Sequence, residues 1–152
     1  MSKPLICLCL TADTIEKDLA LVEKYRPYID LVELRADLLE DDERLNIRDF
    51  PALAKIPCIL TIRRMVDGGK YAEGEASRSM LFARALAYAS EDSKKNFAYV
   101  DFEEDFHISS LQDAAMAYGT RVIRSFHDMK NPIEKGKKNL TLFGIIISSN
   151  SE

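Results

Sequence analysis

The sequence predicts an α/β fold, namely a partial (β/α)8 TIM barrel with about five to six parallel strands. Short apolar runs alternate along the chain with segments of helical periodicity, and this alternation is typical of strand–helix–strand units with a parallel sheet. Polar side chains recur where the predicted strands end, and that rim is where barrels build their active sites. The chain has 152 residues, whereas a complete barrel needs about 250. We therefore expect one incomplete barrel domain over residues 1–152.

Each predicted strand is a short stretch of mostly apolar residues. Residues 5–10 are continuously apolar, as in a strand that is covered on both faces. Residues 30–37 instead alternate apolar and charged positions, so one face of that strand is polar. The five predicted strands and a candidate sixth span residues 5–10, 30–37, 58–63, 98–103, 121–126 and 142–147.

The segments between these strands carry helix signals. Residues 77–89 place apolar side chains on one stripe and predict a strong helix. A polar loop with a short helix is expected over 41–55. Helix starts, breaks and ends are predicted from capping boxes, proline and glycine at Asp13 with Glu16, Pro27, Pro51, Ser109 with Gln112, and Gly119.

Composition excludes several classes of partner. The net charge is −4 with both signs interspersed, and no basic stripe is present, so neither nucleic acid nor an anionic membrane is expected as a partner. The longest apolar runs, 5–10 and 142–147, are far shorter than a membrane span. The N-terminal run is also too short for a secretory signal, and we expect a cytoplasmic protein. The three cysteines and two histidines show no metal-ligand spacing, so no metal or cofactor is expected.

Two predicted strand ends carry charges suited to a polar ligand. Glu33, Arg35 and Asp37 alternate along one strand, so they share a face, and buried charges there need partners or a polar ligand. A structural ion-pair cluster, or the solvated face of an edge strand, is the alternative interpretation. Arg63 ends the third strand before Asp67-Gly68-Gly69; a guanidinium there suits carboxylate or polyhydroxyl ligands.

A histidine completes the predicted site. His127 follows the fifth strand, and an imidazole that titrates near neutral pH can take and return a proton within one cycle. Asp67 and Glu103 are the carboxylates expected to orient it. A satisfied structural histidine is the alternative, because a lone histidine is more often structural than catalytic.

These motifs, in this order, resemble the type I 3-dehydroquinate dehydratases of the shikimate pathway. The resemblance runs from Pro4 to about Pro132 and rests on four stretches at strand ends: 33–37, 61–63 with 67–69, 99–103 and 125–128. It implies a lyase that converts 3-dehydroquinate to 3-dehydroshikimate through a lysine imine and histidine acid/base chemistry. By resemblance, His127 is the general acid/base, and Asp67 stands where relatives have the glutamate that orients it. Glu33, Arg35 and Arg63 would hold the substrate, and Cys9 replaces a common serine.

The resemblance also implies a lysine that this sequence does not place. The imine lysine belongs on a sixth strand, and no lysine occurs beyond Lys138. A Schiff-base lysine needs desolvation or a cationic neighbour to become nucleophilic, and the lysines of the polar stretch 130–138 are not expected to be desolvated. Residues 1–135 are family-like and 136–152 an atypical tail, as in a truncated or frame-shifted chain. The expected function is therefore a dehydratase fragment with little activity alone.

Two other functions fit the same residues. One is a non-catalytic barrel remnant that binds a hydroxylated carboxylate or another chain. The other is a different barrel enzyme that uses His127 and a carboxylate without an imine. Open sheet edges promote association, so a homo-oligomer or self-association is expected.

Overall fold

Five strands and four α-helices alternate along the chain in the computed structural model, which describes residues 3–87 and 89–130. Short 3-10 turns lie between several of them. The elements are β1 (Cys7–Leu10), α1 (Ile15–Tyr25), β2 (Leu31–Arg35), α2 (Phe50–Ala54), β3 (Cys58–Thr61), α3 (Glu75–Leu86), β4 (Tyr99–Glu103), α4 (Ser109–Ala117) and β5 (Arg121–Ser125).

The strands form one parallel sheet in the order β1-β2-β3-β4-β5. Cys9 pairs with Glu33 across β1 and β2, and Thr61 pairs with both Arg35 and Asp101 on its two neighbours. Because sequential parallel strands are joined by helical crossovers, their carboxyl ends all emerge at the same edge of the sheet. The predicted α/β fold with five parallel strands is confirmed. The candidate sixth strand, 142–147, lies outside the described residues.

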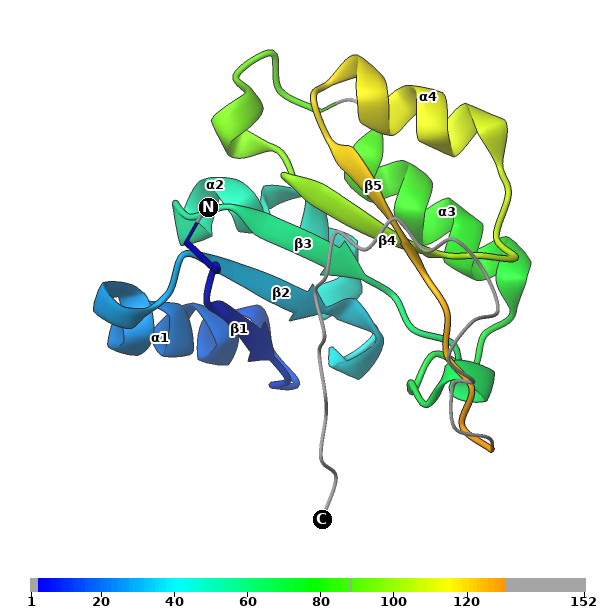
Figure 1. Cartoon of the computed structure of the whole chain (residues 1–152), viewed down its shortest axis with the longest axis horizontal. Coiled ribbons are helices and arrows are strands. Elements are labelled where there is room, and N and C mark those ends of the chain that lie inside the picture. Colours follow the sequence, from blue (N-terminus) through cyan, green and yellow to red (C-terminus); the bar gives the residue numbers. More distant parts are fainter. Residues whose placement is uncertain (1–2, 88, 131–152) are drawn as a thin grey trace.

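The two faces of the sheet differ in character. Figure 1 shows the helices gathered on one side of the twisted sheet. On that side, alternate strand residues such as Val32, Leu34 and Leu60 join helix residues in one buried apolar core. Phe82 of α3 packs there edge-on against Phe102 of β4, with ring centroids 5.0 Å apart. The opposite side chains of the same strands face away from the helices, and this inner face carries the predicted site.

Local details at the helix ends differ from the sequence prediction. Thr14, not Asp13, caps α1, because its side chain accepts from the Lys17 backbone N–H. Asp13 instead pairs with the Lys17 side chain. Pro51 stands in the first turn of α2 rather than breaking it, since proline tolerates a position where no N–H is needed.

The ends of the later helices differ from the prediction by up to three residues. The third helix runs over Glu75–Leu86 rather than 77–89. Ser109 is the first residue of α4 and makes no capping hydrogen bond, so that predicted cap is wrong. Gly119 does close the helix in the left-handed conformation, with φ of 81°.

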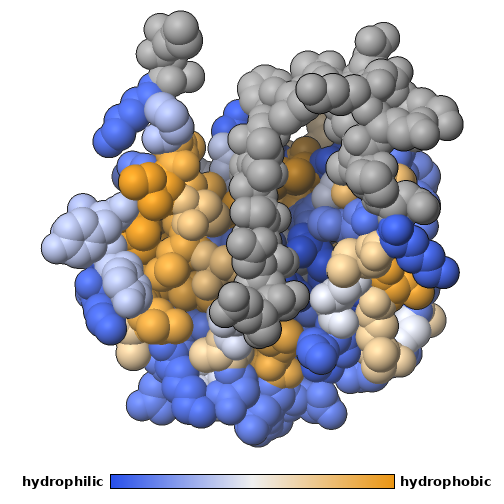
Figure 2. Space-filling view, turned by 60° about the horizontal axis from the view of Figure 1, so that its bottom comes forward, coloured by the Kyte–Doolittle hydropathy of each residue, from blue (hydrophilic) through white to orange (hydrophobic). Residues whose placement is uncertain are grey.

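The outer edge of β1 is apolar at its start. Leu5 and Ile6, which lead into β1, are 64% and 54% exposed, and Figure 2 shows apolar residues gathered on the left of the surface it presents. Neither β1 nor β5 has a second strand partner within the described part of the chain. Among the helices described there, none has the length and apolar character needed to cross a bilayer.

Candidate active site

Two of the three predicted ligand-binding residues, Glu33 and Arg63, meet at the carboxyl ends of β2 and β3. Glu33 lies on the inner face of β2 and is 1% exposed. Its Oε1 accepts a hydrogen bond from Thr61 Oγ1 at 2.6 Å, and Arg63 Nη2 lies 3.9 Å from the same oxygen. Side chains two residues apart on a strand share a face, which places Thr61 and Arg63 together beside Glu33. The structure therefore brings Glu33 and Arg63 into one cluster.

Asp101 of β4 extends this cluster, although the sequence reasoning gave it no role of its own. Arg63 Nη2 donates to Asp101 Oδ2 at 3.1 Å. The Asp101 residue is 6% exposed, so this ion pair lies in a low-dielectric setting. The signal was present in the sequence: Asp101 precedes Glu103 by two residues in a predicted strand, at inner-face parity. The sequence alone does not show that Asp101 pairs with Arg63, which lies just after β3.

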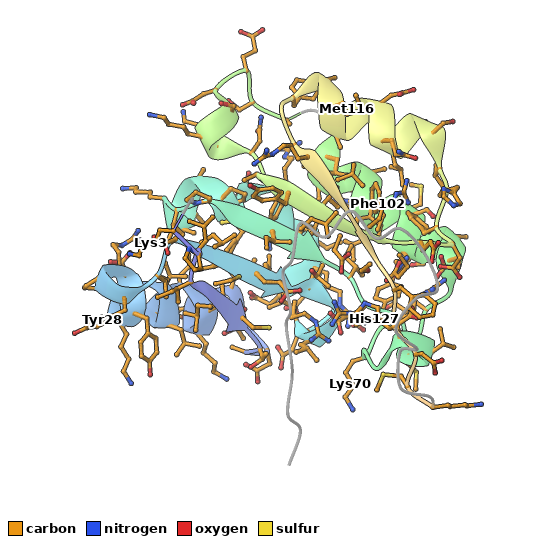
Figure 3. All side chains as sticks on the ribbon, in the orientation of Figure 1. Lys3, Tyr28, Lys70, Phe102, Met116 and His127 are labelled. Atoms are coloured by element: carbon orange, nitrogen blue, oxygen red, sulfur yellow. The ribbon has the colours of Figure 1, made fainter. Side chains whose placement is uncertain are left out.

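His127 lies beside the cluster, just after the end of β5 at Ser125. Figure 3 shows it next to the ends of β2 and β3, far from Met116 on α4. Burial lowers the pKa of the imidazole, and the positive charge of Arg63 lowers it further. The carboxylates of Asp101, Asp67 and Glu33 act in the opposite direction and do not cancel the effect. A lowered pKa keeps the ring neutral at pH 7, the form that accepts a proton.

Within residues 3–87 and 89–130, five buried polar atoms in this region find no hydrogen-bond partner. They come from β2, β3, β4, β5 and the segments just after them: Glu33 Oε2, Arg63 Nε, Asp101 Oδ1, Ser125 Oγ and His127 Nε2. Unsatisfied buried polar atoms are costly, and native proteins tolerate few of them. Here they converge from four neighbouring strand ends. The set contains donors, acceptors and an imidazole, which together suit a polyhydroxylated ligand.

Arg35 is held in a pair of its own. Its Nε and Nη2 donate to the two carboxylate oxygens of Asp37 at 2.9 and 2.8 Å. Asp37 also accepts from the Lys70 backbone N–H at 3.1 Å, so the pair ties the end of β2 to the loop after β3. Arg35 stays at the rim of the site, and its side chain is 11% exposed. The strand predicted over 30–37 thus ends at Arg35, and Asp37 lies in a 3-10 turn after it. The alternative of a structural ion pair accounts for this part of the charged stretch.

The two carboxylates expected to orient His127 have other partners. Asp67 Oδ2 accepts from Arg64 Nε at 2.6 Å. Both Glu103 oxygens accept from Arg78 of α3, at 3.1 and 2.5 Å. Asp67 lies near enough to His127 for its negative charge to raise the pKa of the imidazole. Glu103 is joined to Arg78 in the helix layer and does not orient the histidine.

The glycine pair after β3 shapes the loop that carries Asp67. A Cβ on Gly69 would lie 2.2 Å from the Arg63 carbonyl oxygen, so no other residue fits there without moving the backbone. Gly68 has φ of 81°, in the left-handed region that favours glycine. The Gly69 N–H donates to the Arg64 carbonyl at 2.9 Å. These close contacts fold the chain back and hold Asp67 at the mouth of the site.

Cys7 and Cys9 line the inner face next to Glu33. Burial raises the pKa of both thiols to about 12, and the Glu33 carboxylate contributes in the same direction. Both thiols therefore stay protonated at neutral pH and are poor nucleophiles. In the described part of the chain, no three His, Cys, Asp or Glu side chains stand close enough to hold a metal ion.

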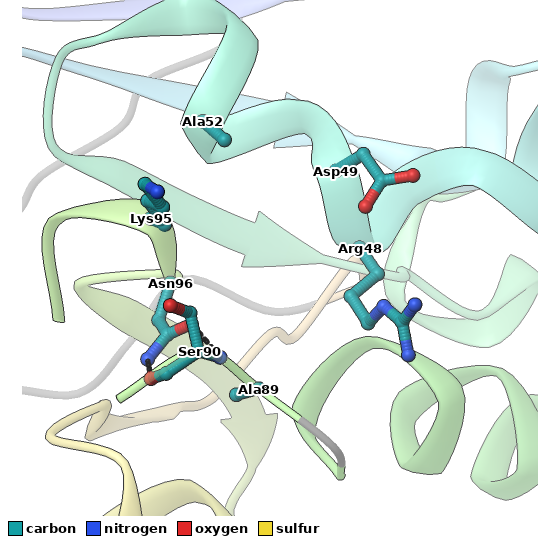
Figure 4. Close-up of a pocket in the computed structure, with 7 residues that line it drawn as sticks. All are labelled: Arg48, Asp49, Ala52, Ala89, Ser90, Lys95 and Asn96. Atoms are coloured by element: carbon teal, nitrogen blue, oxygen red, sulfur yellow. Dashed lines mark hydrogen bonds between the residues drawn. The ribbon is translucent and has the colours of Figure 1, made fainter. Parts of the chain in front are cut away.

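A separate cavity of about 230 Å³ lies away from these residues. Figure 4 shows its lining, which includes Arg48, Lys95, Ser90 and Asn96. These residues come from segments that lead into β3 and β4, so the cavity is at the amino ends of the strands. The Asn96 amide is already satisfied by Ser90, from which it accepts at 2.8 Å and to which it donates at 2.6 Å. The cavity has no part in the cluster around His127.

Fold and site together define a class: an α/β barrel-type sheet with a half-buried histidine and a cluster of buried charged side chains at the carboxyl ends of its strands. Comparison with known families makes the assignment specific. Residues 6–143 match the family model of type I 3-dehydroquinase, and the chain belongs to that family. Its fold is the TIM barrel, of which the described residues form five consecutive parallel strands. The match reaches beyond residue 135, and the boundary expected there lies outside the described residues.

Individual relatives agree with this family. The chain is 30% identical over 137 residues to the 3-dehydroquinate dehydratase of Methanocaldococcus jannaschii, covering 88% of this chain and 57% of that protein. It is 29% identical to the enzyme of the same name from Methanococcus vannielii, covering 86% and 56%. The structure of 3-dehydroquinate dehydratase from Enterococcus faecalis shares the fold, with a TM-score of 0.71 at 23% identity and coverage of 86% and 56%. The chain thus spans just over half the length of these relatives.

Proposed function

We propose that this chain forms the 3-dehydroquinate-binding and proton-transferring part of a type I 3-dehydroquinate dehydratase. The observation that carries the proposal is the set of five unpartnered polar atoms around His127. Dehydroquinate is a hydroxylated cyclic ketone with a carboxylate, and such a ligand offers both donors and acceptors to this set. A buried cluster without such a ligand would leave the cost of desolvation unrecovered.

The proposed role of each residue follows from its position. Glu33, with one oxygen held by Thr61, presents its second oxygen to a substrate hydroxyl. Arg63, anchored through Nη2 to Asp101, presents Nε as a donor. Arg35, fixed by Asp37, contributes positive charge at the rim. Thus each substrate-binding group is oriented by a protein partner before the ligand arrives, which lowers the entropic cost of binding.

His127 is the proposed general acid/base. Its neutral imidazole accepts the proton from the carbon next to the substrate ketone, and the imidazolium that results gives a proton to the departing hydroxyl, which leaves as water. Arg63 favours the neutral ring at the start of the cycle, whereas Asp101, Asp67 and Glu33 favour the charged ring that forms. The imine lysine implied by the family belongs to a region outside the described residues, and its chemistry is part of the proposal for the complete site only.

Binding of 3-dehydroquinate, measured by titration calorimetry, tests this proposal. Truncating one member of a buried charge pair costs about 2 kcal/mol or more, so Arg63→Met is expected to weaken binding about 30-fold or more. Arg48→Met, which removes an exposed arginine at the other end of the sheet, is the matched control and keeps wild-type affinity. Equal affinity for both variants, or no binding by the wild type at millimolar ligand, would contradict the proposal.

Borohydride reduction with dehydroquinate, followed by intact mass measurement, tests the covalent step separately. Binding without an adduct supports a ligand-binding part whose imine lysine is not in the chain. An adduct mass locates a functional lysine within it. Turnover without an adduct would overturn the imine chemistry and favour acid–base catalysis by His127 alone.

A further inference from the structure

Arg64 links two loops at the mouth of the site, directly beside Arg63. Its Nε donates to Asp67 Oδ2 at 2.6 Å, in the loop after β3. Its Nη1 and Nη2 donate to the two oxygens of Asp105, in the loop after β4, at 3.2 and 2.9 Å. All three guanidinium nitrogens are thereby used, so the plane of the group is fixed.

The two carboxylates differ in exposure, and this difference separates their roles. The Asp67 side chain is 10% exposed, whereas that of Asp105 is 70% exposed. A charge pair with a shielded carboxylate is stronger than one with a solvated carboxylate. Asp105 therefore holds the guanidinium from the solvent side, and Asp67 is the carboxylate whose negative charge Arg64 chiefly balances.

Asp67 stands where the family resemblance predicts the partner of the catalytic histidine, yet His127 Nε2 has no hydrogen-bond partner among the residues that the structure describes. We propose that Arg64 is a positioning residue that holds the Asp67 carboxylate in an ion pair and so withholds it from the His127 imidazole. The inference rests on the proposed role of His127 as the acid/base group. Arg64 keeps the ring neutral and ready to accept a proton, and it does so without touching the ligand cluster.

The electrostatic surroundings of His127 make this effect measurable. The charged groups that act on the ring are Arg63 just after β3, Asp101 of β4, Glu33 of β2 and Asp67 of the loop. Among these, Asp67 is the one whose charge Arg64 balances by direct contact. Removing Arg64 leaves the Asp67 charge uncompensated, and an uncompensated carboxylate near the ring favours the imidazolium.

Proton NMR titration of the imidazoles tests the inference in the whole chain. Only two histidines are present, and His107 is exposed, so it serves as an internal reference; a His127→Gln variant assigns the signals. In Arg64→Met, the midpoint of His127 is expected to rise by about 0.5 pH unit or more. In Asp67→Asn it is expected to fall, because the positive charge of Arg64 is then the uncompensated one. In the double variant the two changes oppose each other, and the midpoint returns toward the wild-type value.

These opposite signs distinguish positioning from a structural role. A merely structural contact would alter stability in all three variants without this pattern of midpoints. The inference is overturned if Arg64→Met and Asp67→Asn leave His127 unchanged, or move it in the same direction. If Arg64→Met does not fold, Asp67→Asn still tests the sign, and Arg64→Lys keeps the charge while losing the two-loop contact. Failure of dehydroquinate binding would refute the proposed function and leave this charge coupling measurable, so the two failures are separable.

Discussion

The ion pair between Arg78 and Glu103 makes a sharp prediction about stability. The Arg78 side chain is fully buried, and that of Glu103 is 4% exposed. The guanidinium also donates to the Ile62 carbonyl at 2.8 Å and lies over the Phe106 ring, 4.6 Å from its centroid. Arg78 therefore joins α3 to the ends of β3 and β4 from within the core, while the inner face of the sheet is left free for the site.

Removing one partner leaves the other charge buried and unpaired. Such a change costs about 3–5 kcal/mol, compared with a total stability of about 5–15 kcal/mol for a typical domain. With an m-value of about 1–3 kcal/mol/M, Arg78→Met is expected to lower the urea midpoint by about 1 M or more. Far-UV circular dichroism is the suitable probe, because the chain has no tryptophan.

Two further variants decide whether the pair itself is responsible. Arg84→Met removes an exposed arginine from the same helix and is expected to change stability by about 0.5 kcal/mol at most. The double variant Arg78→Met with Glu103→Leu leaves no buried charge, so it is expected to recover much of the loss. The reasoning is refuted if Arg78→Met costs less than about 1 kcal/mol. It is also refuted if the loss of stability in the double variant equals the sum of the losses in Arg78→Met and Glu103→Leu measured separately.

Three other changes give further expected outcomes. Gly69→Ala forces a Cβ against the Arg63 carbonyl oxygen, and dehydroquinate affinity measured by calorimetry is expected to fall together with stability. Burial raises the pKa of Asp18 to about 6, so its ionisation destabilises the fold as pH rises through about 6; urea unfolding at pH 4.5 and 7.5 is expected to show Asp18→Asn gaining relative to wild type at the higher pH. Leu60→Ala empties a fully buried core position and is expected to cost about 2–5 kcal/mol, whereas Met65→Ala, at an exposed position, changes unfolding by about 0.5 kcal/mol or less.

The fold was predictable because its signals are local and repeated. Apolar runs or an alternation of apolar and polar residues mark most of the strands, and the helix between residues 75 and 86 carries its own apolar stripe. Cap positions were less predictable: Asp13 and Thr14 are adjacent polar residues that can both cap a helix, and only the backbone geometry selects Thr14.

The site was predictable as a set of strand ends but not as a set of pairs. Parity placed Glu33 on the polar face of its strand, the strand-end position singled out Arg63, and parallel topology brings the two together. Which carboxylate each arginine binds depends on register and rotamer, which a single sequence does not contain. Hence Asp101 was not recognised as the partner of Arg63, and Glu103 was expected near His127 although it binds Arg78 in the core.

The central claim is that the polar groups of four strand ends form a single ligand site with His127. The most direct test is to add 3-dehydroquinate to the chain and follow both imidazole signals by NMR. The account predicts that His127 shifts saturably while His107 does not, and that Glu33→Gln weakens the effect by removing an acceptor at the other side of the cluster. A His127 signal that ignores saturating ligand, or that responds equally after Glu33→Gln, would contradict it.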